Sequence, residues 1–219
     1  MIVYDPISGD PLTTPVAWRP RTCFVITKLG RNVPSIVNEI RQRSALVLRQ
    51  RKFAVIDAGA ATTGQDFLRK IWQLILEVPI GIAIVYQSMP ARTMGNVFYE
   101  LGLAQALGKE TLVIKAPKAT IPSDFVRTEY IEYDDGFEQK LTDFTKHLRK
   151  RAAYYQTVAQ NLEQNNPLVA IDYYRRAYLL TGKKHPRLMA RAALEGVQLS
   201  GSVGTGLDLL LGFCRGGIG

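Results

Sequence analysis

Glu100 is the residue of this sequence that is best placed to do chemistry. It lies in residues 95–109, between two short apolar runs at residues 80–86 and 111–114. Because these runs are β-branched and bounded by Gly, Pro and Lys, we predict that both are buried parallel strands. Apolar residues between them recur at i, i+4, i+7 and i+10, which predicts a helix that ends at Gly108.

Two interpretations of Glu100 are open at this point. We expect it on the first turns of its helix, where the helix dipole favours a solvated acid that has no function. The alternative is a catalytic carboxylate. A helix that follows a parallel strand starts at the carboxyl edge of the sheet, where open α/β sheets bind their ligands.

The composition limits the function classes. The chain has 219 residues, of which 47% are apolar, which suits one domain of moderate size with an appendage. It contains no run of eighteen apolar residues, and residues 1–20 lack the features of a signal peptide. Cys23 opens an apparent buried strand and Cys214 lies in a Gly-rich tail, so we expect no structural disulfide, and the two cysteines and two histidines lack the close spacing of a metal site. We therefore expect a cytoplasmic protein with no metal, no cofactor and no membrane partner.

The positive charge is concentrated in one part of the chain. The formal net charge is +9, and residues 140–191 hold 11 basic residues but only 3 acidic ones. A solvated helical face would explain this stretch. The alternative is a surface that meets nucleic acid, an anionic surface or an acidic partner.

The order of the predicted elements indicates the fold class. After a turn-rich arm at residues 1–21, which we expect to lie over the domain, strands and helices alternate. The predicted strands are residues 23–26, 53–57, 80–86, 111–115 and 128–133, and helices are predicted at residues 33–51, from residue 67, and around Glu100. This alternation predicts an α/β fold with a doubly wound parallel five-stranded sheet, flavodoxin-like or Rossmann-like, and a small all-α helical extension. The expected boundaries are 22–150 for the α/β domain, 151–200 for the extension and 201–219 for a Gly-rich tail.

Right-handed crossovers place every strand-to-helix loop on one edge of such a sheet. The functional groups expected at that edge are Lys28, Asn32, Asp57, Thr62, Thr63, Ser88, Arg92, Asn96, Tyr99 and Glu100.

The C-terminal part is predicted to be helical, at residues 137–148, 152–163, 167–180 and 186–199. Residues 152–180 resemble a single tetratricopeptide-type hairpin. One such unit cannot bury its own face, so it should pack on the α/β domain, a second copy or neighbouring helices. The Gly-rich tail is expected to pack on a partner or to lead into a longer protein.

The central helix carries a family resemblance. Residues 96–104 read Asn-Val-Phe-Tyr-Glu-Leu-Gly-Leu-Ala, followed by Ala-Leu-Gly-Lys and an apolar strand. This motif, Asp57 at the end of the second strand, and Pro-Ser-Asp at 122–124 resemble the nucleoside 2-deoxyribosyltransferase-like and TIR-like superfamily. The resemblance covers residues 22–148.

The resemblance implies a chemistry for Glu100. In that superfamily a helix glutamate acts at the anomeric carbon of a nucleoside, and the N-glycosidic bond breaks. Such cleavage passes through an oxocarbenium-like state, which a carboxylate stabilises or traps as an ester. Carried over to this chain, Glu100 is the catalytic residue and the substrate is held by Lys28, Asn32, Asp57, Ser88, Arg92, Asn96 and Tyr99.

The sequence departs from the deoxyribosyltransferases at one point. They have a second acid shortly before the nucleophile, whereas here no Asp or Glu lies between Ser88 and Tyr99. Arg92 stands there instead and suits a phosphate-bearing substrate. The resemblance to the TIR-like branch then implies hydrolysis or cyclisation of NAD, a homo-oligomer, and a role in bacterial immunity.

Three alternatives stay open beside NAD cleavage. The same pocket could belong to a non-catalytic nucleotide sensor whose oligomeric state changes on binding. The chain could be a nucleoside deoxyribosyltransferase despite the missing acid. It could also be an interaction module that recruits nucleic acid or an acidic partner through residues 140–191.

Overall fold

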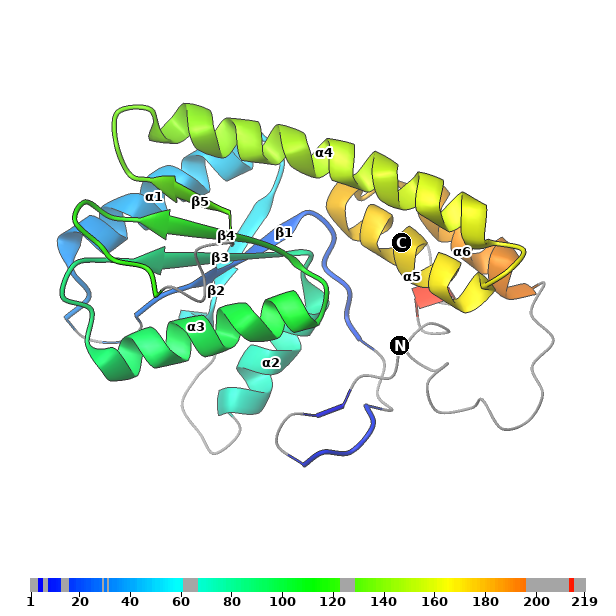
Figure 1. Cartoon of the computed structure of the whole chain (residues 1–219), viewed down its shortest axis with the longest axis horizontal. Helices are drawn as coiled ribbons and strands as arrows, with labels where there is room; N and C mark the ends of the chain where they lie inside the picture. Colours follow the sequence, from blue (N-terminus) through cyan, green and yellow to red (C-terminus); the bar gives the residue numbers. More distant parts are fainter. Residues whose placement is uncertain are drawn as a thin grey trace. The chain divides into compact units, whose positions relative to one another are not determined.

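The computed structural model of this chain describes residues 4–5, 8–12, 16–28, 30, 32–60, 67–122, 129–195 and 213–214. The chain forms two compact units (Figure 1). One consists of residues 21–147, called here the α/β unit, and the other of residues 1–20 with 148–219, called the helical unit. Among the described residues, no helix combines the length and the apolar character that crossing a membrane requires.

The α/β unit is built on a five-stranded sheet in which every neighbouring pair of strands is parallel. The strands are β1 (Thr22–Ile26), β2 (Ala54–Asp57), β3 (Ile80–Val85), β4 (Glu110–Lys115) and β5 (Tyr130–Glu132). Their order across the sheet is β2-β1-β3-β4-β5. The predicted doubly wound, flavodoxin-like sheet is therefore confirmed. All residues of β1 and β3 are buried, as expected for central strands covered on both faces.

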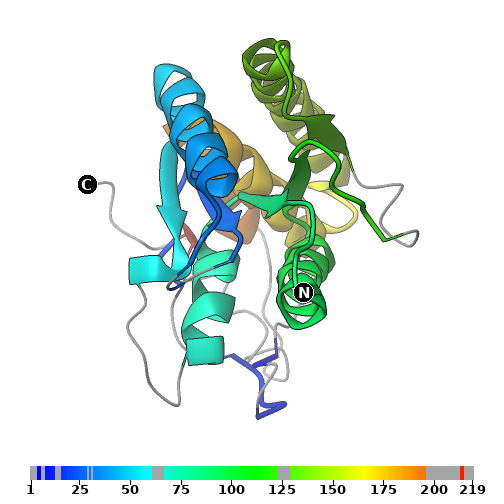
Figure 2. The ribbon, with the colours of Figure 1, turned by 90° about the vertical axis from the view of Figure 1, so that its left-hand side faces the viewer.

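Helices cover both faces of the sheet (Figures 1 and 2). They are α1 (Ser35–Gln50), α2 (Phe67–Glu77) and α3 (Ala91–Ala106), with a short 3₁₀ turn, η1 (Ala58–Ala60), after β2. On β3, a Cβ added to Gly81 would lie 3.4 Å from the Cβ of Ala104, so α3 packs closely on that face. Figure 2 shows α1 on the opposite face from α2 and α3.

The strand order reverses between β1 and β3. In open α/β sheets, ligands bind at the carboxyl ends of the two strands that flank such a reversal. Thr27 follows β1, and its hydroxyl donates to the carbonyl oxygen of Ile84 in β3 at 3.4 Å. Tyr86 follows β3 directly. The fold thus predicts a ligand site at this edge, close to the start of α3.

The largest difference from the predicted elements is α4 (Phe137–Leu162), a single helix of 26 residues. We expected two helices, at residues 137–148 and 152–163. The residues between them are Arg149, Lys150 and Arg151, which are good helix formers, and no Gly or Pro interrupts them. Strand β5 is also shorter than the predicted 128–133, and Thr128 lies outside the described residues.

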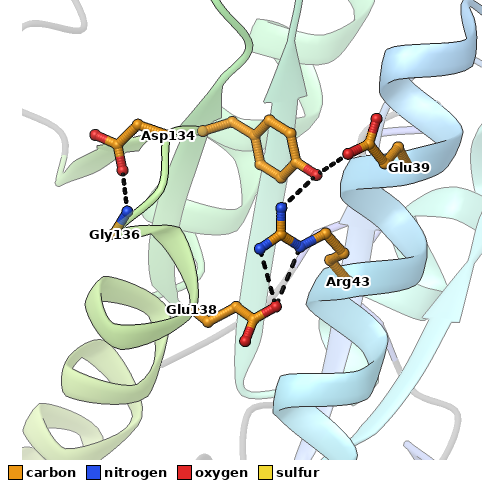
Figure 3. A network of polar contacts seen from close by, with 6 residues as sticks. Glu39, Arg43, Asp134, Gly136 and Glu138 are labelled. Carbon is orange, nitrogen blue, oxygen red and sulfur yellow. Dashed lines mark hydrogen bonds and ion pairs between the residues drawn. The ribbon is translucent and has the colours of Figure 1, made fainter.

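A polar network in the α/β unit joins α1 to the start of α4 (Figure 3). The Tyr133 hydroxyl donates to Glu39 at 2.5 Å and accepts from Arg43 at 3.0 Å. The same guanidinium donates twice to one oxygen of Glu138, at 3.0 and 3.1 Å. These bonds raise the pKa of Arg43, and the network links α1 to the start of α4.

The helical unit contains α5 (Pro167–Thr181) and α6 (Lys184–Glu195) besides the second half of α4. The side chain of Asn166 caps the start of α5, and Gly182, in the left-handed conformation, ends it. The buried cluster around α5 consists of Ala159, Ala170, Ile171, Tyr174, Ala190, Phe213 and Cys214. The predicted hairpin corresponds to the second half of α4 and to α5. It is covered by α6 and by Phe213 and Cys214. Residues 196–212 and 215–219, which include most of the predicted Gly-rich tail, lie outside the described residues.

The arm contributes to the helical unit. Trp18 packs against the cluster around α5 and meets the ring of Phe213 edge-on, with 6.5 Å between the ring centroids. The Arg175 guanidinium lies 4.6 Å from the centre of the Trp18 ring. The expectation that the arm lies over the α/β domain is therefore wrong for Trp18. Its large apolar ring is partly buried against the cluster around α5 instead.

Part of the basic stretch is used inside the helical unit. Asp172 is buried and forms ion pairs with Arg175 at 2.5 Å and Arg176 at 2.9 Å. Burial would raise the pKa of Asp172, but the two guanidiniums outweigh it and lower that pKa. Arg187 donates to the carbonyl oxygen of Phe213 at 2.9 Å. These arginines therefore stabilise the unit and are not a free basic surface.

Candidate active site

Glu100 lies in the middle of α3. The helix starts at Ala91, directly after Pro90, so Glu100 is its tenth residue and lies about 14 Å along the axis from Ala91. The expectation that Glu100 occupies the first turns is wrong, because residues 91–96 are already helical. The helix dipole acts mainly on the first turn. It therefore does not explain an acid at this position.

Glu100 borders the buried side of α3. The buried residues of the helix are Val97, Phe98, Leu101 and Ala104, and Glu100 itself is half-buried. The Gln105 amide donates to the Thr111 hydroxyl of β4 at 3.2 Å, so that flank of α3 faces β4. Glu100 is rotated about 140° around the helix from Gln105. It therefore lies on the flank that faces α2, which packs along α3.

The electrostatic state of Glu100 differs from that of a surface acid. Burial raises its pKa from the ordinary 4.5 to about 7. Within the part of the chain that the structure describes, its carboxylate has no hydrogen-bond or ion-pair partner. An unpaired carboxylate that is partly withdrawn from water is costly to the fold and is typical of functional sites. These features set Glu100 apart from a solvated acid on the first turn of a helix.

Three other predicted site residues share the helix with Glu100. Arg92, Asn96 and Tyr99 follow one another at i, i+4 and i+7, so they form a stripe along the exposed side of α3. All three are exposed, and 58% of Tyr99 is accessible to solvent. The structure thus places the three side chains on the exposed side of the helix that carries Glu100, with Arg92 about 12 Å along the axis from Glu100.

Lys28, Asn32 and Ser88 lie in loops that follow β1 and β3. The Lys28 ammonium donates to the backbone carbonyl oxygen of Asn32 at 2.9 Å, which ties the two predicted residues together. Asn32 and Ser88 both have positive φ angles, 64° and 60°, as expected in tight loops. These loops flank the reversal of strand order, at the edge where α3 begins.

Asp57 is not brought to Glu100. One of its carboxylate oxygens pairs with Arg41 of α1, and the other accepts from the backbone N–H of Gly59 at 2.8 Å. Gly81 of β3 faces α3, and Phe24 of β1 is in register with Gly81. The next residue, Val25, therefore points to the α1 face, and Asp57 is in register with Val25. Asp57 and Glu100 therefore belong to opposite faces of the sheet. Thr62 and Thr63 lie outside the described residues.

Tyr86 is a candidate that the sequence analysis did not single out. It directly follows β3 at the reversal of strand order, and only 7% of it is exposed. Its hydroxyl has no hydrogen-bond partner in the described part of the chain, and burial raises its pKa. In the sequence analysis, Tyr86 belongs to the apolar strand predicted at residues 80–86. A tyrosine at a strand's carboxyl end next to a predicted ligand edge was the available signal.

The described residues contain no group of three or more His, Cys, Asp or Glu side chains that could hold a metal ion.

Comparisons with known proteins give only structural matches. No family model and no curated protein sequence matches this chain. One similar solved structure is a 2-deoxyribosyltransferase from the psychrotolerant bacterium Bacillus psychrosaccharolyticus, with 13% sequence identity and a TM-score of 0.42 over 56% of this chain and 90% of the other. Another is the CMP N-glycosidase BcmB from Clostridium botulinum, with 20% identity and a TM-score of 0.38 over 55% of this chain and 97% of the other. Because both TM-scores are below 0.5, the function of this chain has to be inferred from its own residues.

Proposed function

We propose that this chain cleaves the N-glycosidic bond of a nucleoside or nucleotide, with Glu100 as the catalytic carboxylate. The observation that carries the proposal is the state of Glu100, whose carboxylate is half-buried and without a partner in the described part of the chain. Burial raises its pKa to about 7. The sequence motif around Glu100 supports the same chemistry.

In the proposed reaction the bond between the anomeric carbon and the base nitrogen breaks, and the base leaves with the bonding electron pair. The sugar develops positive charge, which the ionised Glu100 stabilises or traps as an ester. Water then attacks the anomeric carbon and releases the sugar with a hydroxyl group. A carboxylate in a poorly solvated position is suited to this role, because its attraction to a nearby cation is less screened than in water.

The residues of α3 support a phosphate-bearing substrate, and NAD is the one that we test first. Arg92 is exposed about 12 Å along the axis from Glu100, within the combined reach of an arginine side chain and a ribose phosphate. Asn96 and Tyr99 lie between them and carry groups that can bind ribose hydroxyls. With NAD, hydrolysis would release nicotinamide and ADP-ribose.

The test is an incubation of the purified chain with NAD, with ribonucleotides including CMP, and with a mixture of deoxynucleosides. Products are separated by chromatography. The wild type runs beside Glu100→Gln, which keeps the size of the side chain but cannot ionise. Glu129→Gln, at an exposed position, is the matched control. We expect free base from the wild type and from the control, and at least a 1,000-fold loss in Glu100→Gln.

The substrate that yields free base decides among the candidates. Nicotinamide from NAD supports the proposal in full, and base from CMP or another ribonucleotide keeps the chemistry but replaces the substrate. Base exchange between deoxynucleosides would identify a transferase. No product from any of them, at protein concentrations that permit assembly, would overturn catalysis in favour of a nucleotide sensor. Equal turnover by Glu100→Gln would overturn the role of Glu100.

A further inference from the structure

The α/β unit has a cavity that the proposed reaction does not use. Its volume is about 590 Å³, within the range of small-molecule sites. It is called here the α1 groove, and it is lined by Val25, Asn38, Arg41, Gln42, Ala45, Leu46, Arg49, Val55 and Asp57. Six of these residues come from α1 and the others from β1 and β2.

The α1 groove is separate from Glu100. Its strand residues Val25, Val55 and Asp57 point to the α1 face of the sheet, as the parallel registers of β1 and β2 require. Glu100 belongs to α3, which packs on the other face (Figure 2). A ligand in the α1 groove therefore does not reach Glu100.

The polar groups of the groove are mostly unused by the fold. In the described part of the chain, the side chains of Asn38, Gln42 and Arg49 make no hydrogen bond or ion pair. Arg41 and Asp57 pair with each other. The groove thus offers one free guanidinium and two free amides, and its one carboxylate is neutralised.

The apolar groups of the groove are partly open to solvent. The groove lies along β2, an edge strand of the sheet, and Val55 of that strand is only half-buried. Leu46, which lines the groove, is 59% exposed. Next to Val55 it forms an uncovered apolar wall that a flat ring could contact.

We propose that the α1 groove binds a phosphate monoester that carries a hydrogen-bonding ring. Arg49 binds the phosphate, since guanidinium groups match phosphate geometry and this one has no acid partner among the described residues. The ring lies on Leu46 and Val55. The amides of Asn38 and Gln42, which both donate and accept, bind its polar edge. Gln42 lies about 10 Å along α1 from Arg49, a separation that suits the length of a mononucleotide or a sugar phosphate.

The test is a titration of the ¹⁵N-labelled full chain, followed through backbone amide signals. The probes are the four 5′-ribomononucleotides, ribose 5-phosphate, the matching nucleosides and inorganic phosphate. We use the Glu100→Gln background so that no probe is consumed. We expect saturable shifts of α1 and β2 signals, with the nucleosides at least 10-fold weaker than the phosphorylated probes. Response to the nucleotides alone identifies a nucleotide site, and response to ribose 5-phosphate identifies a sugar-phosphate site.

Two variants test the roles of the residues. Arg49→Gln should weaken binding at least 10-fold, and Leu46→Glu should abolish it by placing a negative charge on the apolar wall. Arg149→Gln, at an exposed position with no partner among the described residues of the chain, removes the same charge and should bind normally. Shifts confined to α3, no shift with any probe, or normal binding by both groove variants would overturn the proposal. None of these outcomes bears on whether Glu100 cleaves a substrate.

Discussion

The carboxylate of Glu100 is half-buried in the middle of α3 and has no partner in the described part of the chain. Burial is a property of the packed fold, so no pattern along the chain could give the raised pKa.

The pKa of Glu100 predicts how the proposed activity depends on pH. The reaction needs the ionised carboxylate, and burial raises the pKa of this group to about 7. We therefore expect kcat/KM to rise about 10-fold from pH 6 to pH 8 and then to level off. Initial rates across this range, with the most rapidly cleaved substrate, measure the effect. A rate that falls with rising pH would instead assign Glu100 the role of a general acid.

The same raised pKa predicts a pH-dependent change in stability. Between pH 4.5 and 7 the folded chain holds a proton on Glu100 that the unfolded chain has released, so the free energy of unfolding falls as pH rises through this window. Because Gln cannot ionise, Glu100→Gln does not undergo this fall in the free energy of unfolding. The variant should match the wild type at pH 4 and exceed its stability by roughly 2–3 kcal/mol at pH 8.

Urea unfolding at the two pH values measures this difference. Glu129→Gln, which changes an exposed position, should show the same small effect at both. If Glu100→Gln and the wild type had the same free energy of unfolding at pH 8, burial of the ionised Glu100 carboxylate would not destabilise the fold.

At the scale of elements, the strands were easier to predict than the helix ends. The first four strands are predicted from short, continuous apolar runs, whereas β5 is predicted from an alternating run that suits a more exposed strand. The break expected within α4 is absent, because the basic run 149–151 favours helix as strongly as its flanks do. Likewise, the pairing of Asp57 with Arg41 depends on how α1 packs on β2, which spacing along the chain does not reveal.

The network of Figure 3 makes a prediction about the contact between α1 and α4. Tyr133→Phe keeps the ring but removes the hydroxyl that bridges Glu39 and Arg43. We expect the free energy of unfolding to fall by about 1–2 kcal/mol, since two charged groups each lose a hydrogen bond. Urea unfolding measures it. Tyr130→Phe is the matched control, because that tyrosine is 47% exposed and its hydroxyl has no hydrogen bond in the described part of the chain, so it should change little.

At the scale of the whole molecule, the helical unit joins residues from both ends of the sequence. The sequence predicted a helical extension but assigned the arm to the α/β domain. The contacts of Trp18 with Phe213 and Arg175 reverse that assignment for the ring. Contacts between residues almost 200 positions apart leave no periodic signal, so this arrangement could not be predicted from the chain.

Trp18 therefore offers a test that separates the two units. Trp18→Ala removes an aromatic ring from the cluster around α5 and should destabilise the helical unit by about 3 kcal/mol. We expect faster backbone hydrogen exchange in α5 and α6 and unchanged exchange in β1, β3 and β4, measured by mass spectrometry. Faster exchange throughout the chain would contradict the division into two units.

The shared packing of residues 1–20 and 148–219 makes the α/β unit an insertion between two parts of the helical unit. On the ribosome, residues 21–147 become available as a complete folding unit while the arm still lacks its helices. At typical rates of protein synthesis, Trp18 waits on the order of ten seconds before α5 exists to cover it. The connectivity of the chain therefore determines the order in which the two units can fold during synthesis. We therefore expect the unit that carries Glu100 to form first, and the unit around α5 to close only after α5 and α6 have emerged.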